Sequence, residues 1–219
     1  MDSVSSVGVL DKVVALLNAL EQRGPLGLGE LQQAIGLPRA TTHRLAVALE
    51  QHAMVRRDAA GRFELGLGLI GLGRAAAERI PVSSVARPVM ESLRERTGED
   101  VQLYVREGDV RRCVLSLQSA HALRWIVPEG AVLPLDRGSA GRVLSRLPGR
   151  KQSPWVESVE ERVKGVASVS AAVCDPTGLV IAAVSVAGPV ERLTRSPGRR
   201  FGAAVVSAAE EISRRLATI

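Results

Sequence analysis

Apolar residues recur at helical spacing in three stretches near the start of the chain. The stretch "VLDKVVALLNALEQRG" stops at a Gly-Pro pair, and "GLGELQQAIG" ends in glycine, a residue that commonly closes a helix. A third helix is expected from about Arg39 to Gln51, directly after the Leu37-Pro38 turn. The positions expected to face the interior are Leu10, Val13, Val14, Leu17 and Leu20 in the first helix, Leu28, Leu31 and Ile35 in the second, and Leu45, Ala48 and Leu49 in the third.

The third helix carries its polar and basic side chains first and its leucines afterwards. Its first two turns hold Arg39, Thr41, Thr42, His43 and Arg44. A helix that only closes a core does not need this order, whereas a helix whose first turns enter something polar and anionic does. Two short helices joined by a tight turn, with polar residues opening the second, indicate a helix-turn-helix.

A strand, turn and strand pattern follows this helix directly. The stretch "MVRRDAAGRFELG" predicts two strands joined by a turn at Asp58–Gly61, which makes the unit a winged helix-turn-helix. Arg56, Arg57 and Arg62 are then expected on or near the wing. Any one of these arginines alone is more simply read as a solvated surface residue. Arginines on both presumed contact elements favour a surface that binds DNA.

The rest of the chain combines helical stretches with apolar strands. The stretch "GLGLIGLGRAAAERI" predicts a glycine-spaced helix interrupted at Pro81, and "SSVARPVMESLRERTGE" predicts a helix closed by Gly98. A long amphipathic helix is expected at the C-terminus, in "GRRFGAAVVSAAEEISRRLATI". The expected strands are Val101–Arg106, Arg112–Gln118, Leu123–Val127, Val166–Val173 and Leu179–Ala187. These elements predict an α+β chain with one antiparallel sheet and helices packed on it.

Composition and charge narrow the functional classes. The chain of 219 residues is 46% apolar and 24% charged, and no apolar run approaches the ~20 residues that span a bilayer, so a cytoplasmic protein with no membrane partner is expected. The net charge of +6 lies entirely in residues 67–219, because residues 1–66 hold seven basic and seven acidic side chains. Bulk charge therefore does not indicate DNA binding. The local excess does, since residues 38–63 contain five arginines against Glu50 and Asp58.

A catalytic centre, a cofactor and a metal site are not expected. His43, His52 and His121 have no evident Ser or Cys partner and no metal-spaced neighbour. Cys113 and Cys174 lie far apart and are expected to be buried thiols. Neither GxxxxGK[ST] nor GxGxxG is present, and "DRGSAG" is better read as a helix start whose N–H groups face a small carboxylate.

Several stretches together resemble the IclR family of bacterial transcriptional regulators. The resemblance begins in "VLDKVVALLNAL", "GLGELQQAIGLPRATTHRLAVALEQHAMVRRD" and "GRFELG". It continues through "RTGEDVQLYVREGD", "VPEGAVLPLDRGSAGRVL", "ERVKGVASVSAAV" and "IAAVSVAGPVERL". The chain looks most similar to the actinobacterial branch, whose members are tied to amino-acid biosynthesis. The resemblance implies a winged helix-turn-helix over residues 1–66, a linker helix over 67–86 and a GAF-like α/β effector-binding domain over 87–219.

The implied function is sequence-specific regulation of transcription at a double-stranded DNA operator. A single winged domain reads few base pairs, so a homodimer through the N-terminal and linker helices is expected, with pairs of dimers in some relatives. The DNA-binding residues expected are Arg39, Ala40, Thr41, Thr42, His43 and Arg44 on the helix and Arg56, Arg57 and Arg62 on the wing. The alternative is a sensor that acts through protein contacts. Steep salt dependence would indicate DNA binding instead.

The resemblance also implies an effector pocket on one face of the C-terminal sheet. The residues carried over to it are Leu123, Trp125, Ser139, Ala140, Ser158, Glu160, Val166, Ser168, Ser185 and Ala187. Hydroxyls and backbone N–H groups beside apolar side chains suit a small carboxylate with an apolar tail, such as a branched-chain amino acid or its keto or hydroxy acid precursor. Acid-binding relatives have an acidic residue and a second serine where this chain has Ser158 and Ala187, so their ligands cannot simply be transferred. The alternative is that these serines only fill a tightly packed sheet.

One segment departs from the family pattern. Family members carry an extra helical segment between the stretches that correspond to "GRVLSRLPG" and "WVESVEERVKG", and here only "RKQSP" connects them. Either the chain has a true deletion here or the printed sequence leaves out a stretch, and in both cases the family does not predict the rim of the pocket.

Overall fold

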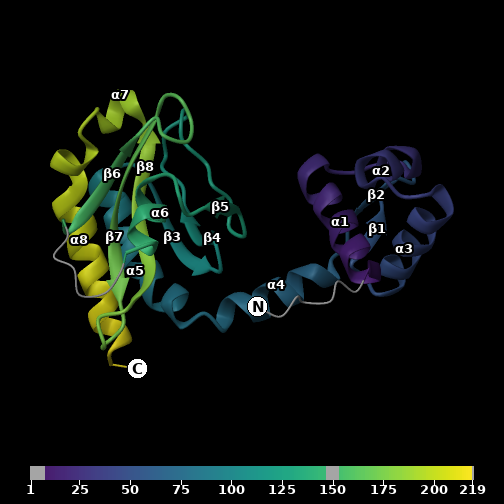
Figure 1. Cartoon of the computed structure of the whole chain (residues 1–219), viewed down its shortest axis with the longest axis horizontal. Helices are drawn as coiled ribbons and strands as arrows, with labels where there is room; N and C mark the ends of the chain where they lie inside the picture. The colour runs from purple at the N-terminus through teal and green to yellow at the C-terminus, as the bar shows by residue number, and fades with distance from the viewer. Residues whose placement is uncertain (1–7, 147–152, 219) are drawn as a thin grey trace. The chain divides into compact units, whose positions relative to one another are not determined.

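The computed structural model describes residues 8–146 and 153–218, except for the side chain of Glu78. The chain forms two compact units that divide between Ala76 and Ala77 (Figure 1). The shortened connection after "GRVLSRLPG" lies mostly outside the described residues.

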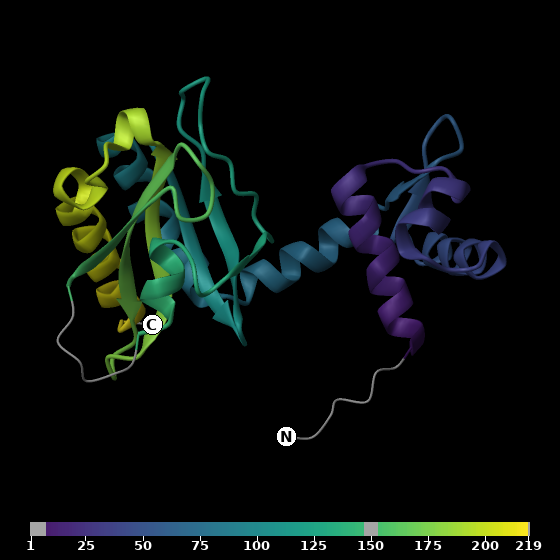
Figure 2. The same ribbon diagram turned by 45° about the horizontal axis from the view of Figure 1, so that its top comes forward.

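The first unit is a three-helix domain with a β-hairpin, which confirms the predicted helix-turn-helix and wing (Figure 2). Its elements are α1 (Gly8–Arg23), α2 (Leu28–Ile35), α3 (Arg39–Gln51), β1 (Val55–Arg57) and β2 (Phe63–Leu65). The two strands pair antiparallel, with Val55 opposite Leu65. Gly36 ends α2 in the left-handed conformation at φ 65°, which a residue without Cβ adopts at little cost, and its N–H donates to the carbonyl of Gln32.

In α1 and α3, the side of the helix that is buried in this core is rotated from the side predicted to face inward. In α1, Leu10 and Val14 are 59% and 53% exposed, whereas Leu16 is fully buried. In α3, Ala48 is exposed and Ala46 is buried. Buried Leu31, Leu49, Val55 and Phe63 complete the cluster. The side of a helix that faces inward is set by the neighbouring helices and the hairpin, and not by apolar spacing alone.

The second unit is one antiparallel sheet with helices packed on it, as predicted (Figure 1). The strand order is β5-β4-β3-β8-β7-β6. Its strands are β3 (Asp100–Glu107), β4 (Val110–Leu117), β5 (Val132–Pro134), β6 (Trp155–Val159), β7 (Val166–Cys174) and β8 (Val180–Pro189). Its helices are α5 (Pro81–Thr97), α6 (Ser139–Leu144), α7 (Val190–Leu193) and α8 (Pro197–Leu216). Helix α4 (Gly68–Glu78) precedes them and lies mostly within the first unit.

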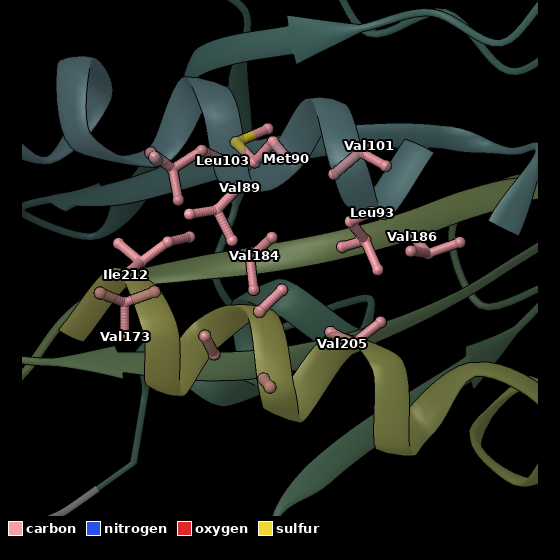
Figure 3. Packing of buried hydrophobic residues seen from close by; sticks show 14 of the residues in the cluster. Val89, Met90, Leu93, Val101, Leu103, Val173, Val184, Val186, Val205 and Ile212 are labelled. Atoms are coloured by element: carbon pink, nitrogen blue, oxygen red, sulfur yellow. The ribbon is translucent and has the colours of Figure 1, made fainter. Parts of the chain in front are cut away.

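Helices α5 and α8 cover one face of the sheet and bury its main apolar core. Figure 3 shows Met90 and Leu93 of α5 converging with Val184 of β8 and Val205 of α8. Glycines bring α8 close to the sheet, because a Cβ on Gly198 or Gly202 would collide with the ring of Trp155. Since Val82 and Ala86 are also buried in this core, the sheet domain includes α5 and begins before residue 87.

The strand prediction was wrong at one segment and missed two others. Residues 123–127 form an irregular connection, in which the N–H of Trp125 donates to the Asp100 carboxylate at 2.8 Å instead of to a neighbouring strand. The missed strands are the two edge strands of the sheet, β5 and β6. An edge strand is paired on one side only and is short here, so its apolar alternation is weak.

Candidate functional site

The opening turns of α3 present a polar, basic surface. Arg39, Ala40, His43 and Arg44 are exposed, and Thr41 is half-buried. Within residues 8–146 and 153–218, neither Arg39 nor Arg44 has a carboxylate within ion-pair distance. Both guanidiniums are therefore available to an anionic partner.

Thr42 does not belong to this surface, contrary to the prediction. It is 0% exposed, and its hydroxyl donates to the carbonyl of Pro38 at 3.2 Å. It lies four and seven residues before Ala46 and Leu49, on the face of α3 that packs inward. Thr42 therefore stabilises the first turn and the core and cannot touch DNA in this fold.

The three wing arginines are exposed, but each already has a carboxylate partner. Arg56 pairs with Glu64 at 2.9 Å, Arg57 with Glu50 at 3.3 Å and Arg62 with Asp58 at 2.7 Å. Arg57 also lies over the ring of Phe63, with 4.3 Å from its Cζ to the ring centroid. Exposed pairs of this kind contribute only about 0–1 kcal/mol, so a phosphate can replace the carboxylate at little cost.

Asp58 holds the wing turn in shape. Its carboxylate accepts hydrogen bonds from the N–H groups of Ala60 and Arg62, both at 2.9 Å. The backbone bond from Arg62 is the main reason that the pKa of Asp58 is lowered. The turn therefore presents Arg62 in a defined position. Counting Glu64, this surface carries five arginines and three carboxylates, a smaller excess than residues 38–63 suggested.

The second candidate site is a pocket on the sheet face opposite α5 and α8. It contains about 430 Å³ of space between α6, β7, β8 and the 160–166 turn, part of it open to solvent. Eight of the ten predicted effector residues line it, namely Trp125, Ser139, Ala140, Ser158, Val166, Ser168, Ser185 and Ala187. The lining residues that sequence reasoning missed are Tyr104, Arg111, Gly138, Glu161, Arg162 and Val163.

Leu123 and Glu160 are not brought into this pocket. Leu123 is 69% exposed, and its carbonyl accepts a hydrogen bond from Arg192 at 2.9 Å. The Glu160 carboxylate accepts from the N–H of Gly165 at 2.9 Å and pairs with Arg195 at 3.3 Å, so it shapes the 160–165 turn. The backbone of Glu160 has φ 57°, and this turn places the next residue, Glu161, at the pocket instead.

A chain of serine hydroxyls crosses the pocket floor. The Oγ of Ser139 lies 2.7 Å from the Oγ atoms of both Ser168 and Ser170, and Ser170 donates to Ser185 at 2.9 Å. Ser170 lies directly opposite Ser185 in the β7–β8 ladder. The floor is therefore polar and neutral, with hydroxyls that largely satisfy one another.

The start of α6, predicted as the seat of the effector carboxylate, is occupied by a carboxylate of the chain itself. The N–H of Gly138 donates to Glu161 at 3.0 Å, and Glu161 also pairs with Arg142 at 2.8 Å. An anionic ligand would have to displace Glu161 or use other donors.

Arg111 lies beside this helix start and is 3% exposed. Its Nη1 donates to the carbonyls of Pro134 and of Arg137, the latter at 2.7 Å, and its Cζ lies 5.4 Å from the ring centroid of Tyr104. A Cβ on Gly141 would collide with this guanidinium, so the glycine makes room for it. A signal for Arg111 was available in the sequence, because strand alternation places it on the same face as Cys113, which packs beside Tyr104 and Ala140 near this pocket. A register shift after Cys113 turns Leu115 to the other face, into the core against α5 and α8.

Burial determines the ionisation of the groups around the pocket. Desolvation raises the pKa of Tyr104, which keeps its hydroxyl a neutral donor, and lowers the pKa of Arg111. Burial likewise raises the pKa of Cys113 to about 12, so its thiol is unreactive, as expected. Cys174 is only half-buried, contrary to the expectation for both cysteines.

The described part of the chain has no group of three His, Cys, Asp or Glu residues that could hold a metal ion. Among the described helices, none is long and apolar enough to cross a membrane.

Residues 9–59 match the IclR helix-turn-helix domain, and residues 74–153 and 146–214 match the bacterial transcriptional regulator IclR C-terminal domain. The chain belongs to the IclR family. It is a DNA-binding transcriptional regulator with a C-terminal effector-binding domain, and not an enzyme. The alternative of a sensor that acts without DNA is therefore set aside. The two C-terminal matches overlap at residues 146–153.

Individual relatives agree with this assignment. KipR of Bacillus subtilis is 33% identical over 150 residues, which cover 68% of this chain and 60% of that protein. The transcriptional repressor IclR of Escherichia coli is 26% identical over 229 residues, covering 88% of this chain and 84% of that protein. An IclR homolog from Microbacterium hydrocarbonoxydans, solved with 4-hydroxybenzoate, shares the fold with a TM-score of 0.81 at 20% identity and covers 96% of this chain and 100% of that one.

Proposed function

We propose that this protein controls genes of amino-acid metabolism, in particular of leucine and the other branched-chain amino acids, by binding an operator whose affinity depends on a small carboxylate in the pocket. The observation that carries the DNA-binding surface is the pair of exposed arginines, Arg39 and Arg44, without carboxylate partners among the described residues. The pathway is proposed only from the resemblance of the sequence motifs to the actinobacterial branch of the family. We place the protein in the cytoplasm, where its DNA target lies.

In this proposal, α3 enters the major groove and the wing contacts the backbone or the adjacent minor groove. Arg39, Ala40, Thr41, His43 and Arg44 are the residues of α3 that reach DNA. Arginine suits guanine edges and phosphates, and threonine suits phosphate or a thymine methyl group. Arg56, Arg57 and Arg62 would exchange their carboxylate partners for phosphates.

The protein is proposed to act as a homodimer that binds a partly palindromic site, with pairing of dimers as a further step. Large apolar side chains stand exposed on α1 and along α4: Val9 54%, Leu10 59%, Val14 53%, Ile70 66% and Leu72 57%. Exposed apolar surface of this extent is uncommon in a monomer and supports a protein contact. The predicted interface through the N-terminal and linker helices would bury these side chains.

The effector is proposed to be a small carboxylate with an apolar tail, held against Trp125 and Val166. The relative solved with 4-hydroxybenzoate carries a ligand of this chemistry, although it shares only 20% identity.

The test is binding of the purified protein to DNA fragments from upstream of its own gene and of neighbouring genes, measured by fluorescence anisotropy at several salt concentrations. Each phosphate contact should contribute about −0.9 to the slope of log K against log salt. A flat salt dependence on every fragment would contradict the proposal. Release of the bound fragment on addition of a carboxylate metabolite would support the effector role.

A further inference from the structure

The pocket contains a buried positive charge that no carboxylate of the described residues contacts. Exposed Asp136 acts on it only from a distance and itself pairs with Arg137. Arg111 is 3% exposed, and its Nη1 contacts are two neutral carbonyls. Its Nε is buried without a hydrogen-bond partner. Over the described residues, Arg111 forms no ion pair with a carboxylate. A buried guanidinium without a counter-charge is costly, and natural proteins seldom keep one without a partner.

A second guanidinium, that of Arg162, lines the same pocket. Its Cζ lies 5.4 Å from the ring centroid of Trp125, and it too forms no ion pair within the described ranges. The two positive charges repel each other, since Arg162 contributes to the lowering of the Arg111 pKa. An anion placed between them would relieve this repulsion.

The acidic residue of the pocket does not balance these charges. Glu161 is the one acidic side chain in the lining, and it is engaged with Arg142 and the N–H of Gly138. The lining around Arg111 and Arg162 is otherwise neutral, with serine hydroxyls, the Tyr104 phenol and apolar side chains.

We infer that the pocket selects a dicarboxylate, with one carboxylate on Arg111 at the floor and the other on Arg162 beside Trp125. A guanidinium binds a carboxylate through paired N–H donors, and the buried Nε of Arg111 has no hydrogen-bond partner among the described residues. A monocarboxylate would leave one of the two guanidiniums uncompensated. The inference rests on the proposed function, because it specifies the class of effector that the same pocket binds.

Isothermal titration calorimetry of the full chain with matched pairs of probes tests the inference. The pairs are 2-isopropylmalate against 4-methyl-2-oxopentanoate, which carries one carboxylate and no ammonium group, and terephthalate against 4-hydroxybenzoate. We expect at least one dicarboxylate to bind about tenfold or more tightly than its monocarboxylate counterpart. Equal affinities within both pairs, or no binding of any of the four probes, would overturn the inference.

The variants Arg111→Met and Arg162→Met show which arginine binds which carboxylate of the ligand. Arg162→Met should reduce dicarboxylate affinity to that of the monocarboxylate and leave the monocarboxylate unchanged. Arg111→Met should weaken both classes by about tenfold or more. Arg112→Met is the matched control, because Arg112 lies next in the strand but pairs with exposed Glu107 outside the pocket lining. Wild-type affinity for both ligand classes in Arg111→Met and Arg162→Met would place the anion elsewhere and overturn the inference.

Arg111 also supports the backbone at Pro134 and Arg137, so the fold of Arg111→Met must be checked by circular dichroism and thermal melting. Should it unfold, Arg162→Met decides alone, because the side chain of Arg162 makes no hydrogen bond to the described backbone. Operator binding separates the inference from the proposed function. Dicarboxylate binding without any effect on DNA affinity leaves the inference standing and defeats the effector role. If only monocarboxylates release the operator, and they do so equally in Arg111→Met, the effector role stands and the dicarboxylate inference fails.

Discussion

At the scale of single residues, the burial of a side chain decides whether it reaches a binding surface, and residue type alone does not. Adjacent Thr41 and Thr42 have the same side chain, yet only Thr42 is buried, because successive residues of a helix point about 100° apart. Glu160 and Glu161 are also neighbours with the same side chain. The Glu160 carboxylate binds the N–H of Gly165 within the turn, whereas Glu161 lines the pocket. The residue predictions below therefore depend on burial.

Replacement of Arg44 by alanine should weaken operator binding by about 1–3 kcal/mol if the side chain reads a base. The expected cause is loss of a charge-assisted contact from an exposed guanidinium without a carboxylate partner among the described residues. Anisotropy titrations at fixed salt measure the effect. The control is Arg23→Ala, an exposed arginine at the end of α1. Equal affinity of Arg44→Ala and wild type, with the fold intact, would remove Arg44 from the interface.

Thr42→Val should lower the free energy of unfolding. Because Thr42 is buried, the substitution should remove no contact with DNA. It removes the hydroxyl that donates to Pro38 while keeping the side-chain volume. The expected loss in the free energy of unfolding is about 0.5–1.5 kcal/mol, measured by urea denaturation. Thr41→Val, at the half-buried neighbouring position, should change stability less. A Thr42→Val protein of full stability would contradict the assigned hydrogen bond.

At the scale of elements, a buried ion pair connects the start of the sheet to α7 and to the pocket segment. Arg192 binds both carboxylate oxygens of Glu99, at 2.7 and 2.8 Å, and its Nη1 donates to the carbonyl of Leu123. The neighbouring Asp100 accepts from the N–H groups of Ser119 and Trp125. These contacts replace strand pairing in residues 119–125 and position Trp125 against the pocket.

Arg192→Met should therefore destabilise the sheet domain strongly. The side chain of Glu99 is 4% exposed, and removal of Arg192 leaves its charge buried and unpaired. Loss of one partner of a fully buried pair costs about 3–5 kcal/mol. Since Arg192 is 26% exposed, the expected loss in the free energy of unfolding is about 2–4 kcal/mol, measured by urea denaturation. Arg195→Met, in which a 77% exposed side chain is lost from its pair with Glu160, should cost no more than about 1 kcal/mol. If the two variants lost the same free energy of unfolding, the pair with Glu99 would stabilise the domain no more than an exposed pair does.

At the scale of the whole molecule, the proposed dimer gives the exposed apolar side chains of α1 and α4 a partner. Leu10→Glu and Ile70→Glu place a charge at 59% and 66% exposed positions, so neither should disturb the folded monomer. Light scattering at micromolar concentration should show a dimer or larger assembly for wild type and a smaller species for the variants. Operator affinity should fall with assembly, because two winged domains in register are needed for a specific site.

The matched control is Leu123→Glu. Leu123 is also an exposed leucine, at 69%, but it lies outside these two helices. It should leave assembly unchanged. A monomeric wild-type protein would contradict the proposed dimer outright.

The sequence by itself determined the winged helix-turn-helix, the main helices, the central strands of an antiparallel α+β domain and the family, because these depend on local periodicity, turn residues and long matching motifs. Eight of the ten expected effector residues also line the pocket, since the motifs lie on β7, β8 and the start of α6, which the fold brings together. Only the tertiary structure decided which face of α1 and α3 is buried and that residues 123–127 form no strand. It also placed Glu161 at the start of α6 and left Arg111 buried without a carboxylate in contact among the described residues. The physical reason is that burial, pairing and desolvation depend on neighbours distant in sequence, which no local pattern contains.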